Sequence, residues 1–434
     1  MGWDLTPSAS ERHHGFTIAD KWCRYTCAYR DYQGRTHCPP NRCICATKSP
    51  TPSPTPSPPT PSPTPSPTPT AVALHEEVEL RLSESSSNIE ASAVEPVRTG
   101  ETPNGPRYMF LGTATELIKV LRDTPAGGAM NVVKRMALSG AGAKDCVALQ
   151  VEAGADGFVY AAVSLVAKSL NVGHASVAAV LKIRKADLQV VGVHKFDQSS
   201  NMAYSLAMDA DFLYSGQYTY PGRIVKMAKD SMSVVSTLVL EKGQDDVRWI
   251  FKNQDSSSQR LFVLTNTAPG IVLEVDTAGA MKVLGSGQSL GTGYDHPLAG
   301  VAGDFDEDFL YAGTNTYPGR VVKVSKRTLR PVSTLTLPKG HDTVVALQSD
   351  GVFVYAATYS KPGHVVQIRK ADMRIEAQLT LTQGEEQLTT MVHGEDHLYV
   401  TTDTENGRVV RLAGFQNWKH VDAKNEVKAS VLVR

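Results

Sequence analysis

The sequence predicts an all-β protein built around a seven-bladed β-propeller, and two observations lead to this fold class. The first is a hairpin signature, in which the apolar run Phe309–Thr314 leads through a Pro-Gly turn at 318–319 into a second apolar run that starts at Arg320. Two such runs joined by a tight turn indicate a β-hairpin, which is only marginally stable by itself in water. The second observation is that the hairpin recurs along the chain.

Seven copies of the hairpin can be aligned, and the last five carry a turn glycine every 44 to 49 residues. The motif Arg-Lys-Ala-Asp also occurs twice, at 184–187 and 369–372, after the second strand of its hairpin. A period in the forties with several short strands per unit is typical of a propeller blade, which buries its faces only against neighbouring blades. The copies lie at 108–120, 158–183, 212–226, 261–273, 309–324, 353–366 and 397–410.

One repeat predicts the whole blade. Residues 343–347 form its inner strand, an Asp-Gly turn follows at 350–351, and three further strands are expected at 352–358, 364–370 and 375–381. The last of these alternates apolar and polar residues, as an outer, half-exposed strand should. The ring is expected to run from about 108 to 415 within a domain spanning 71–434. We expect Val78–Leu82 to close it by pairing with the last blade, together with a tail strand at 427–433.

Charge and hydropathy exclude several classes of function. The chain has 44 basic and 44 acidic residues, so no global field draws it to nucleic acid or to an anionic membrane. No apolar run is long enough to span a bilayer, and the first residues contain no signal peptide. Gly2 and Thr6 fit the loose N-myristoylation pattern, which we interpret as a chance match. A secreted role therefore requires an export signal that this sequence lacks.

Residues 1–48 are predicted to form a cysteine-rich module. Such a short segment cannot build a sufficient core, so cross-links must hold it. Disulfides in a secreted setting are one interpretation, and a zinc site that combines His37 with thiolates is the other. The odd cysteine of the module is free, pairs with another chain or pairs with Cys146, which is otherwise expected as a buried thiol on a blade strand. The disulfide candidates are Cys23, Cys27, Cys38, Cys43 and Cys45.

The pattern Trp-Cys-x-x-x-Cys…Cys-Pro…Cys-x-Cys over residues 22–45 resembles short modules found beside chitin- and cellulose-active domains of algae and protists. This resemblance implies binding to a polysaccharide or cell-wall glycan. Aromatic faces suit sugars, because the C–H face of a pyranose packs on a π-system while hydroxyl groups stay hydrated. The alternative is that the aromatic side chains only cover the disulfides. The candidate sugar-stacking residues are Trp22, Tyr25, Tyr29 and Tyr32.

Residues 49–70 alternate proline with serine or threonine, which predicts a polyproline II linker of roughly 60–70 Å at about 3.1 Å per residue. The composition also indicates an O-glycosylated stalk. The tract resembles the Ser-Pro segments of hydroxyproline-rich glycoproteins in algal and plant walls, which implies hydroxylation and covalent O-linked glycans; a ligand for proline-recognition domains is the alternative. The implied modification sites are Pro52, Pro54, Pro56, Pro58, Pro61, Pro63, Pro65, Pro67, Pro69, Ser53, Ser57, Ser62 and Ser66.

The predicted ring contains no recognisable catalytic, metal or cofactor motif, and we expect no enzyme activity. Gly-Ser-Gly at 285–287 is interpreted as a turn, because no helix follows that would make it a phosphate cradle. Aspartates precede the second strand of several repeats, as in Asp304–Asp308, Asp209–Asp211 and Asp350. A turn-forming role is favoured over calcium binding. The histidines of the repeats fall at different repeat positions and predict no cluster.

One basic position repeats after the turn and predicts a face of the ring that grips carboxylates or sulfates of a partner. The alternative is that each residue caps its own turn or pairs with an acid of the next blade. The tyrosines two residues before the turn glycines, Tyr220 and Tyr317, are expected to face solvent or to pack. The face candidates are Arg223, Arg320, His364 and Arg408.

The repeat resembles the seven-bladed propellers of the YVTN and NHL kind, which are mostly binding platforms, although the core here reads Tyr-x-Gly-Thr-x-Thr-x-Pro-Gly-Arg. We therefore expect an extracellular, non-enzymatic binding or matrix glycoprotein of a cell wall or surface, with glycans, other matrix proteins or copies of itself as partners. Two alternatives remain. One is a structural subunit of a surface or flagellar filament assembled head to tail, and the other is a polysaccharide-active propeller enzyme.

Overall fold

The computed structural model divides the chain into two units, residues 1–69 and 70–434, and each is described by itself. In the first unit the structure describes only the backbone of short strands. In the second it describes 74–82, 89–94, 106–123, 129–138, 145–166, 176–197, 200, 202–252, 259–291, 297–302, 308–394, 397–404 and 406–413. The linker at 49–70 and the expected tail strand at 427–433 lie outside the described residues.

The first unit contains two small sheets. The strands are β1 (Gly15–Ile18), β2 (Lys21–Tyr25), β3 (Tyr29–Arg30), β4 (Thr36–His37) and β5 (Cys43–Ala46). One sheet has the order β1-β2-β5, and β3 pairs with β4 in the other. The predicted cross-links and sugar-stacking contacts depend on side chains that lie outside the described ones, so they stay predictions.

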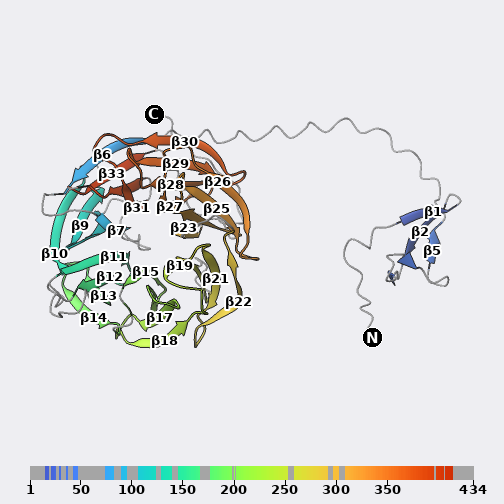
Figure 1. Ribbon diagram of the computed structural model, residues 1–434, viewed down its shortest axis with the longest axis horizontal. Helices are drawn as coiled ribbons and strands as arrows, with labels where there is room; N and C mark the ends of the chain where they lie inside the picture. Colours follow the sequence, from blue (N-terminus) through green and yellow to red (C-terminus); the bar gives the residue numbers. More distant parts are fainter. Residues whose placement is uncertain are drawn as a thin grey trace. The chain divides into compact units, whose positions relative to one another are not determined.

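The second unit contains seven four-stranded antiparallel sheets arranged around a common axis, so the predicted seven-bladed propeller is confirmed (Figure 1). Each blade is a meander whose first strand lies nearest the axis and whose fourth strand lies on the rim. The described residues of this unit form strands and turns and no α-helix.

The first four blades take their strands in chain order. Their strands are β7 (Ile89–Val94), β8 (Arg107–Thr113), β9 (Glu116–Asp123) and β10 (Asn131–Ala137); β11 (Asp145–Ala153), β12 (Phe158–Val166), β13 (Ser176–Arg184) and β14 (Val190–Lys195); β15 (Ala203–Met208), β16 (Phe212–Gln217), β17 (Arg223–Ala228) and β18 (Val234–Val239); and β19 (Val247–Lys252), β20 (Arg260–Thr265), β21 (Ile271–Asp276) and β22 (Lys282–Ser289).

The last three blades include one strand from the start of the propeller. Their strands are β23 (Pro297–Ala302), β24 (Phe309–Thr314), β25 (Arg320–Ser325) and β26 (Pro331–Thr336); β27 (Val344–Ser349), β28 (Phe353–Thr358), β29 (His364–Arg369) and β30 (Arg374–Thr380); and β31 (Leu388–His393), β32 (Leu398–Thr402) and β33 (Arg408–Ala413) with β6 (His75–Arg81).

The ring is closed by β6, which is the fourth strand of the last blade. It pairs antiparallel with β33, from Arg408 opposite Arg81 to Ala413 opposite His75, and the expected closure by this segment is confirmed. The expected start of the ring at about 108 is wrong, because the inner strand of the first blade begins at Ile89. That strand is short and half alanine and serine, so its pattern does not stand out from the surrounding loops.

The turn between the second and third strands is built the same way in several blades. In blade 5 the hydroxyl groups of Thr314 and Thr316 lie 2.7 Å apart, and Thr316 donates to the carbonyl of Pro318. The backbone N–H of Arg320 donates to the Thr314 hydroxyl. The peptide bond before Pro318 is cis. Gly319 packs so closely on the next connection that an added Cβ would lie 3.0 Å from Val344 and 3.2 Å from the His341 carbonyl, which explains the repeated glycine.

The predicted role of aspartate at the first turn of a blade is confirmed where it is described. The carboxylate of Asp350 accepts hydrogen bonds from the backbone N–H groups of Val352 and Phe353 and from the hydroxyl of Tyr355. Asp209 makes the same set of contacts in blade 3, and Asp156 in blade 2 accepts from one backbone N–H group, that of Phe158, and from the Tyr160 hydroxyl. The cluster at 304–307 lies outside the described residues.

A repeated lysine joins neighbouring blades. It lies in the third strand, above the aromatic ring that begins the second strand, at 3.9–4.4 Å from the ring centroid. Its ammonium group donates to a backbone carbonyl in the third turn of the next blade, so each blade caps a turn of its neighbour. The pairs are Lys119 with Lys185, Lys182 with Lys229, Lys226 with Thr277, and Lys323 with Lys370.

The prediction of a turn at Gly-Ser-Gly 285–287 is wrong. These residues lie inside β22, where Gln288 pairs with Val272 and Leu284 pairs with Glu274, so the glycines form a bulge. Gly285 has a positive φ of 70°, and a Cβ on Gly287 would meet Leu273 at 2.6 Å. Glycine is needed here because a bulge combines a left-handed residue with close packing.

Candidate interaction surface

One face of the ring collects the turns between second and third strands and the connections between blades. In a meander both leave from the same end of the blade, and hydrogen bonds join them: Gly319 donates to the His341 carbonyl, and Gly222 donates to the Gln244 carbonyl. We call this the Pro-Gly face. The opposite face carries the remaining two turns of each blade.

The structure places the four basic candidates on this face, each as the first residue of a third strand. Arg223 lies 3.5 Å from the carboxylate of Asp197, and Arg408 lies 3.1 Å from the carboxylate of Glu79 on the closing strand. The Arg320 backbone completes its own turn. Asp197 follows the last strand of the neighbouring blade, as the structural alternative expects for Arg223, whereas Glu79 belongs to the same blade as Arg408. Gripping of an acidic partner stays a prediction.

His364 differs from the other three because it is buried against a second histidine. Its ring stacks on His341 with centroids 3.8 Å apart, and its Nδ1 lies 3.1 Å from the Thr380 hydroxyl. Burial and the neighbouring His341 lower the pKa of His364 to about 4, and burial lowers the pKa of His341. Repeat positions did not reveal this pair, since His341 lies in a connection between blades. The pair is near the rim strand β30 and away from the axis.

The Pro-Gly face carries a row of aromatic residues on blade 3, with an arginine of blade 4 at one end. Tyr220, which is 68% exposed, contacts Tyr218 edge to face at 5.4 Å, and Tyr218 contacts Tyr204 in the same way at 5.6 Å. The guanidinium carbon of Arg248 lies 4.2 Å from the centroid of the Tyr204 ring. We call Tyr220, Tyr218 and Tyr204 the tyrosine row.

Two kinds of local structure hold this row. Tyr218 and Tyr220 lie in the second turn of blade 3, where Tyr220 precedes a cis proline. Tyr204 and Arg248 sit at β-bulges near the start of inner strands β15 and β19, where the pairing register skips one residue. Bulges redirect a side chain relative to its strand. The sequence signal for Tyr220 was its repeat position, but no signal linked it to Tyr204.

Hydrogen bonding and nearby charge define the electrostatics of the row. Tyr220 donates to the Tyr218 hydroxyl over 2.7 Å, and this bond is the main cause that raises the pKa of Tyr220 to about 12. The carboxylates of Asp246 and Asp245 act in the same direction. Asp246 also acts to raise the pKa of Tyr204, after burial as the main cause, whereas the guanidinium of Arg248 over the Tyr204 ring opposes this shift.

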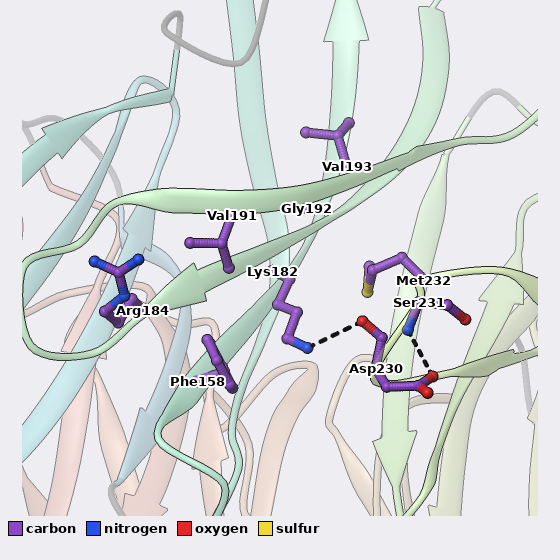
Figure 2. A pocket seen from close by; sticks show the side chains of 9 residues that line it. All are labelled: Phe158, Lys182, Arg184, Val191, Gly192, Val193, Asp230, Ser231 and Met232. Atoms are coloured by element: carbon purple, nitrogen blue, oxygen red, sulfur yellow. Dashed lines mark hydrogen bonds between the residues drawn. The ribbon is translucent and has the colours of Figure 1, made fainter.

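A groove of about 450 Å³ lies near the rim between blades 2 and 3 (Figure 2). Its apolar lining includes Phe158, Val191 and Met232, and Lys182 crosses it to donate to the Lys229 and Asp230 carbonyls at 2.6 and 3.4 Å. A groove of about 400 Å³ with Phe212 and Lys226 lies at the equivalent position between blades 3 and 4. Because the groove repeats with the lysine contact, we interpret it as a junction between blades and not as a single active site.

The described residues contain no group of three histidine, cysteine or acidic side chains positioned to hold a metal ion. Within the same residues no helix is present that would be long and apolar enough to cross a membrane.

The seven four-stranded blades around one axis make the second unit a seven-bladed β-propeller. No protein-family model matches the chain, and no curated protein matches it in sequence. A chain in the crystal structure of a mitotic checkpoint complex is similar in fold, with a TM-score of 0.57 and 12% sequence identity. The match covers 77% of this chain and 91% of the other. At that identity the likeness shows the propeller fold alone.

Proposed function

We propose that the protein is an extracellular, non-enzymatic binding glycoprotein of a cell wall or matrix. In this proposal the cysteine-rich module contacts polysaccharide, the proline-rich linker is a glycosylated spacer, and the Pro-Gly face of the propeller is the interaction platform. The resemblance to propellers of the YVTN and NHL kind, which are mostly binding platforms, supports the role of the ring.

The observation that carries the proposal is the tyrosine row. Tyrosine is enriched in protein interfaces because its ring provides a large contact area at low entropic cost and its hydroxyl adds a hydrogen bond. Tyr220 is 68% exposed and packs edge to face on the half-buried Tyr218, so one ring faces solvent and is supported by the rings behind it. An exposed aromatic ring held in this way is suited to anchor a partner.

The extracellular part of the proposal is tested by the intact mass of the protein purified from its native source, before and after deglycosylation and reduction. The sequence mass is 46.8 kDa. We expect a higher mass and sugar ladders on peptides that span 49–70. An unmodified mass with free thiols or bound zinc in the cysteine-rich module would contradict the proposal.

Polysaccharide contact is tested with the full chain on chitin and cellulose columns. We expect retention that a Trp22→Ala substitution abolishes and that a Tyr317→Ala substitution on the propeller leaves unchanged. Retention of both variants on the columns would contradict the proposal. Depolymerisation of a uronic-acid polysaccharide by the protein would also contradict it and would favour the enzyme alternative.

A structural subunit of a head-to-tail filament is the second candidate. It is favoured by one observation: the closing strand β6 begins, at His75, on the face opposite the Pro-Gly face.

A further inference from the structure

We propose that the tyrosine row on the Pro-Gly face binds the proline-rich tract, residues 49–70, of a second copy of the chain. This inference rests on the proposed role of the face as an interaction platform and names its partner. It combines a surface that the structure shows with a segment that the same sequence encodes.

The row presents rings and hydroxyl groups together. The two edge-to-face contacts, at 82° and 87° between ring planes, turn neighbouring rings in different directions, so flat faces and ring edges alternate along the row. Because the Tyr220 hydroxyl donates to Tyr218, the Tyr218 hydroxyl keeps its own hydrogen for an additional acceptor.

A polyproline II segment matches this chemistry. Its backbone carbonyls have no internal hydrogen bonds, and its pyrrolidine rings pack on aromatic faces, which is how proline-rich segments dock in aromatic-lined grooves. A chain rich in proline is restricted to extended conformations before it binds, so a low entropic cost of ordering is expected for such a sequence. Residues 49–70 consist of proline, serine and threonine only and therefore offer ring packing, hydroxyl groups and polar backbone contacts, with no charged side chain.

Charge favours this neutral partner over an acidic glycan. Asp246 is buried beside the row, where its carboxylate accepts a hydrogen bond from Asn266, and Asp245 is half-buried next to it, so a carboxylated or sulfated polymer would meet like charges there. Arg248, at the other end, already lies against the Tyr204 ring. An uncharged tract has no such penalty.

Topology assigns the tract to a second copy. The tract is followed by β6, whose first residue, His75, pairs with Ala413 at the end of β33, whereas its last residue, Arg81, pairs with Arg408 beside the Pro-Gly face. The chain therefore enters the ring on the opposite face. It also enters at the last blade, across the ring from β15–β18 of the tyrosine row (Figure 1). We therefore assign the tract to the row of a second copy.

The resulting contact joins two different surfaces, the tract of one copy and the Pro-Gly face of the next. Contacts of that kind are heterologous and generate rings or open chains of molecules. We therefore expect oligomers that grow longer as the protein concentration rises. Their formation does not depend on the cysteines.

The test is binding of a fluorescent synthetic peptide, residues 49–70, to the full-length protein, followed by anisotropy, with a second peptide that contains 4-hydroxyproline. We expect at least one peptide to bind and Tyr220→Ala to weaken that binding roughly tenfold or more, as for truncation of an aromatic anchor. Tyr317→Ala is the matched control, since Tyr317 is 78% exposed at the same repeat position but follows Asn315 in place of a second tyrosine. A peptide with alanine for proline controls for composition.

Sedimentation velocity under reducing conditions supplies the second readout. We expect concentration-dependent oligomers that excess peptide dissolves and that Tyr220→Ala shifts to monomer. A chain that stays monomeric and binds neither peptide overturns the inference, as does equal loss of binding in Tyr317→Ala. If instead the row binds a neutral glycan and neither peptide, the partner named here is wrong but the platform role survives. Retention of the full chain on chitin is measured separately, so the two proposals fail independently.

Discussion

The ammonium group of Lys226 donates a hydrogen bond over 2.8 Å to the backbone carbonyl of Thr277, although the two residues belong to neighbouring blades. The same group lies 4.0 Å from the centroid of the Phe212 ring below it. One side chain thus packs on its own blade and satisfies a turn of the next. Since the contact recurs at three other junctions, it couples local blade structure to closure of the ring.

We predict that Lys226→Met lowers the free energy of unfolding by about 2 kcal/mol, because the Thr277 carbonyl loses a charged donor and the Phe212 ring loses its cation. Methionine keeps most of the aliphatic packing. The measurement is urea unfolding followed by circular dichroism. The exposed Lys242→Met is the control and should change stability little, and equal effects of the two substitutions would contradict the role of the contact.

We predict that Tyr355→Phe destabilises the propeller by about 1–2 kcal/mol, because the buried Asp350 carboxylate loses one of its donors. Burial already raises the pKa of Asp350, and loss of the tyrosine hydrogen bond should raise it further. Thermal unfolding of the variant checks the first effect. Tyr317→Phe removes a hydroxyl from an exposed ring and should have no measurable effect; a Tyr355→Phe protein as stable as the parent would show that the bond is not needed.

The buried histidine pair predicts acid sensitivity. Folding lowers the pKa of His364 from 6.5 to about 4 through burial and the neighbouring His341, so the folded state holds the neutral ring while the unfolded chain binds a proton below pH 6.5. Stability should therefore fall as the pH is lowered from about 6.5 to about 4. Asp342 is the nearby acid and opposes this loss.

The measurement for this prediction is the unfolding free energy of the parent and of His364→Gln as a function of pH. The difference between the two proteins isolates the pair from all other titrating groups. We expect the variant to lose less stability than the parent across this pH window. Parallel curves would mean that the pair does not govern the acid response.

Closure of the ring predicts different effects of two equivalent leucines. Leu82 follows β6, Leu240 follows β18, and each backbone N–H donates to a turn glycine of its own blade. Both side chains are buried, so Leu82→Ala and Leu240→Ala should each cost about 2–4 kcal/mol. Leu82 differs because β6 is not joined by a turn to the other strands of its blade, whereas β18 is. Limited proteolysis under native conditions should release the N-terminal segment from Leu82→Ala and leave the chain of Leu240→Ala uncut; identical cleavage of both would refute this role.

Much of the fold could be predicted because the information is periodic and local. The hairpin around Pro318 and Gly319 contains the residues that form its own turn. The hairpin recurs every 44 to 49 residues, and this period predicts a propeller without knowledge of the packing. The closing strand β6 was visible from its alternation. The inner strand at Ile89–Val94 was not visible, because its small residues give only a weak apolar alternation. Burial against two neighbouring blades is what makes this strand favourable.

The sequence by itself determined the number of blades, the repeated turns between second and third strands and the positions that recur in each repeat, because those depend on spacing and on residue types that suit strands and turns. Only the tertiary structure decided which side chains meet within a blade and between blades. Tyr204 joins Tyr218 and Tyr220 of its own blade because a bulge redirects it, and His341 meets His364 because a connection between blades folds over a third strand. Such contacts depend on local irregularities and on tertiary packing, which the order of residues along one strand does not encode.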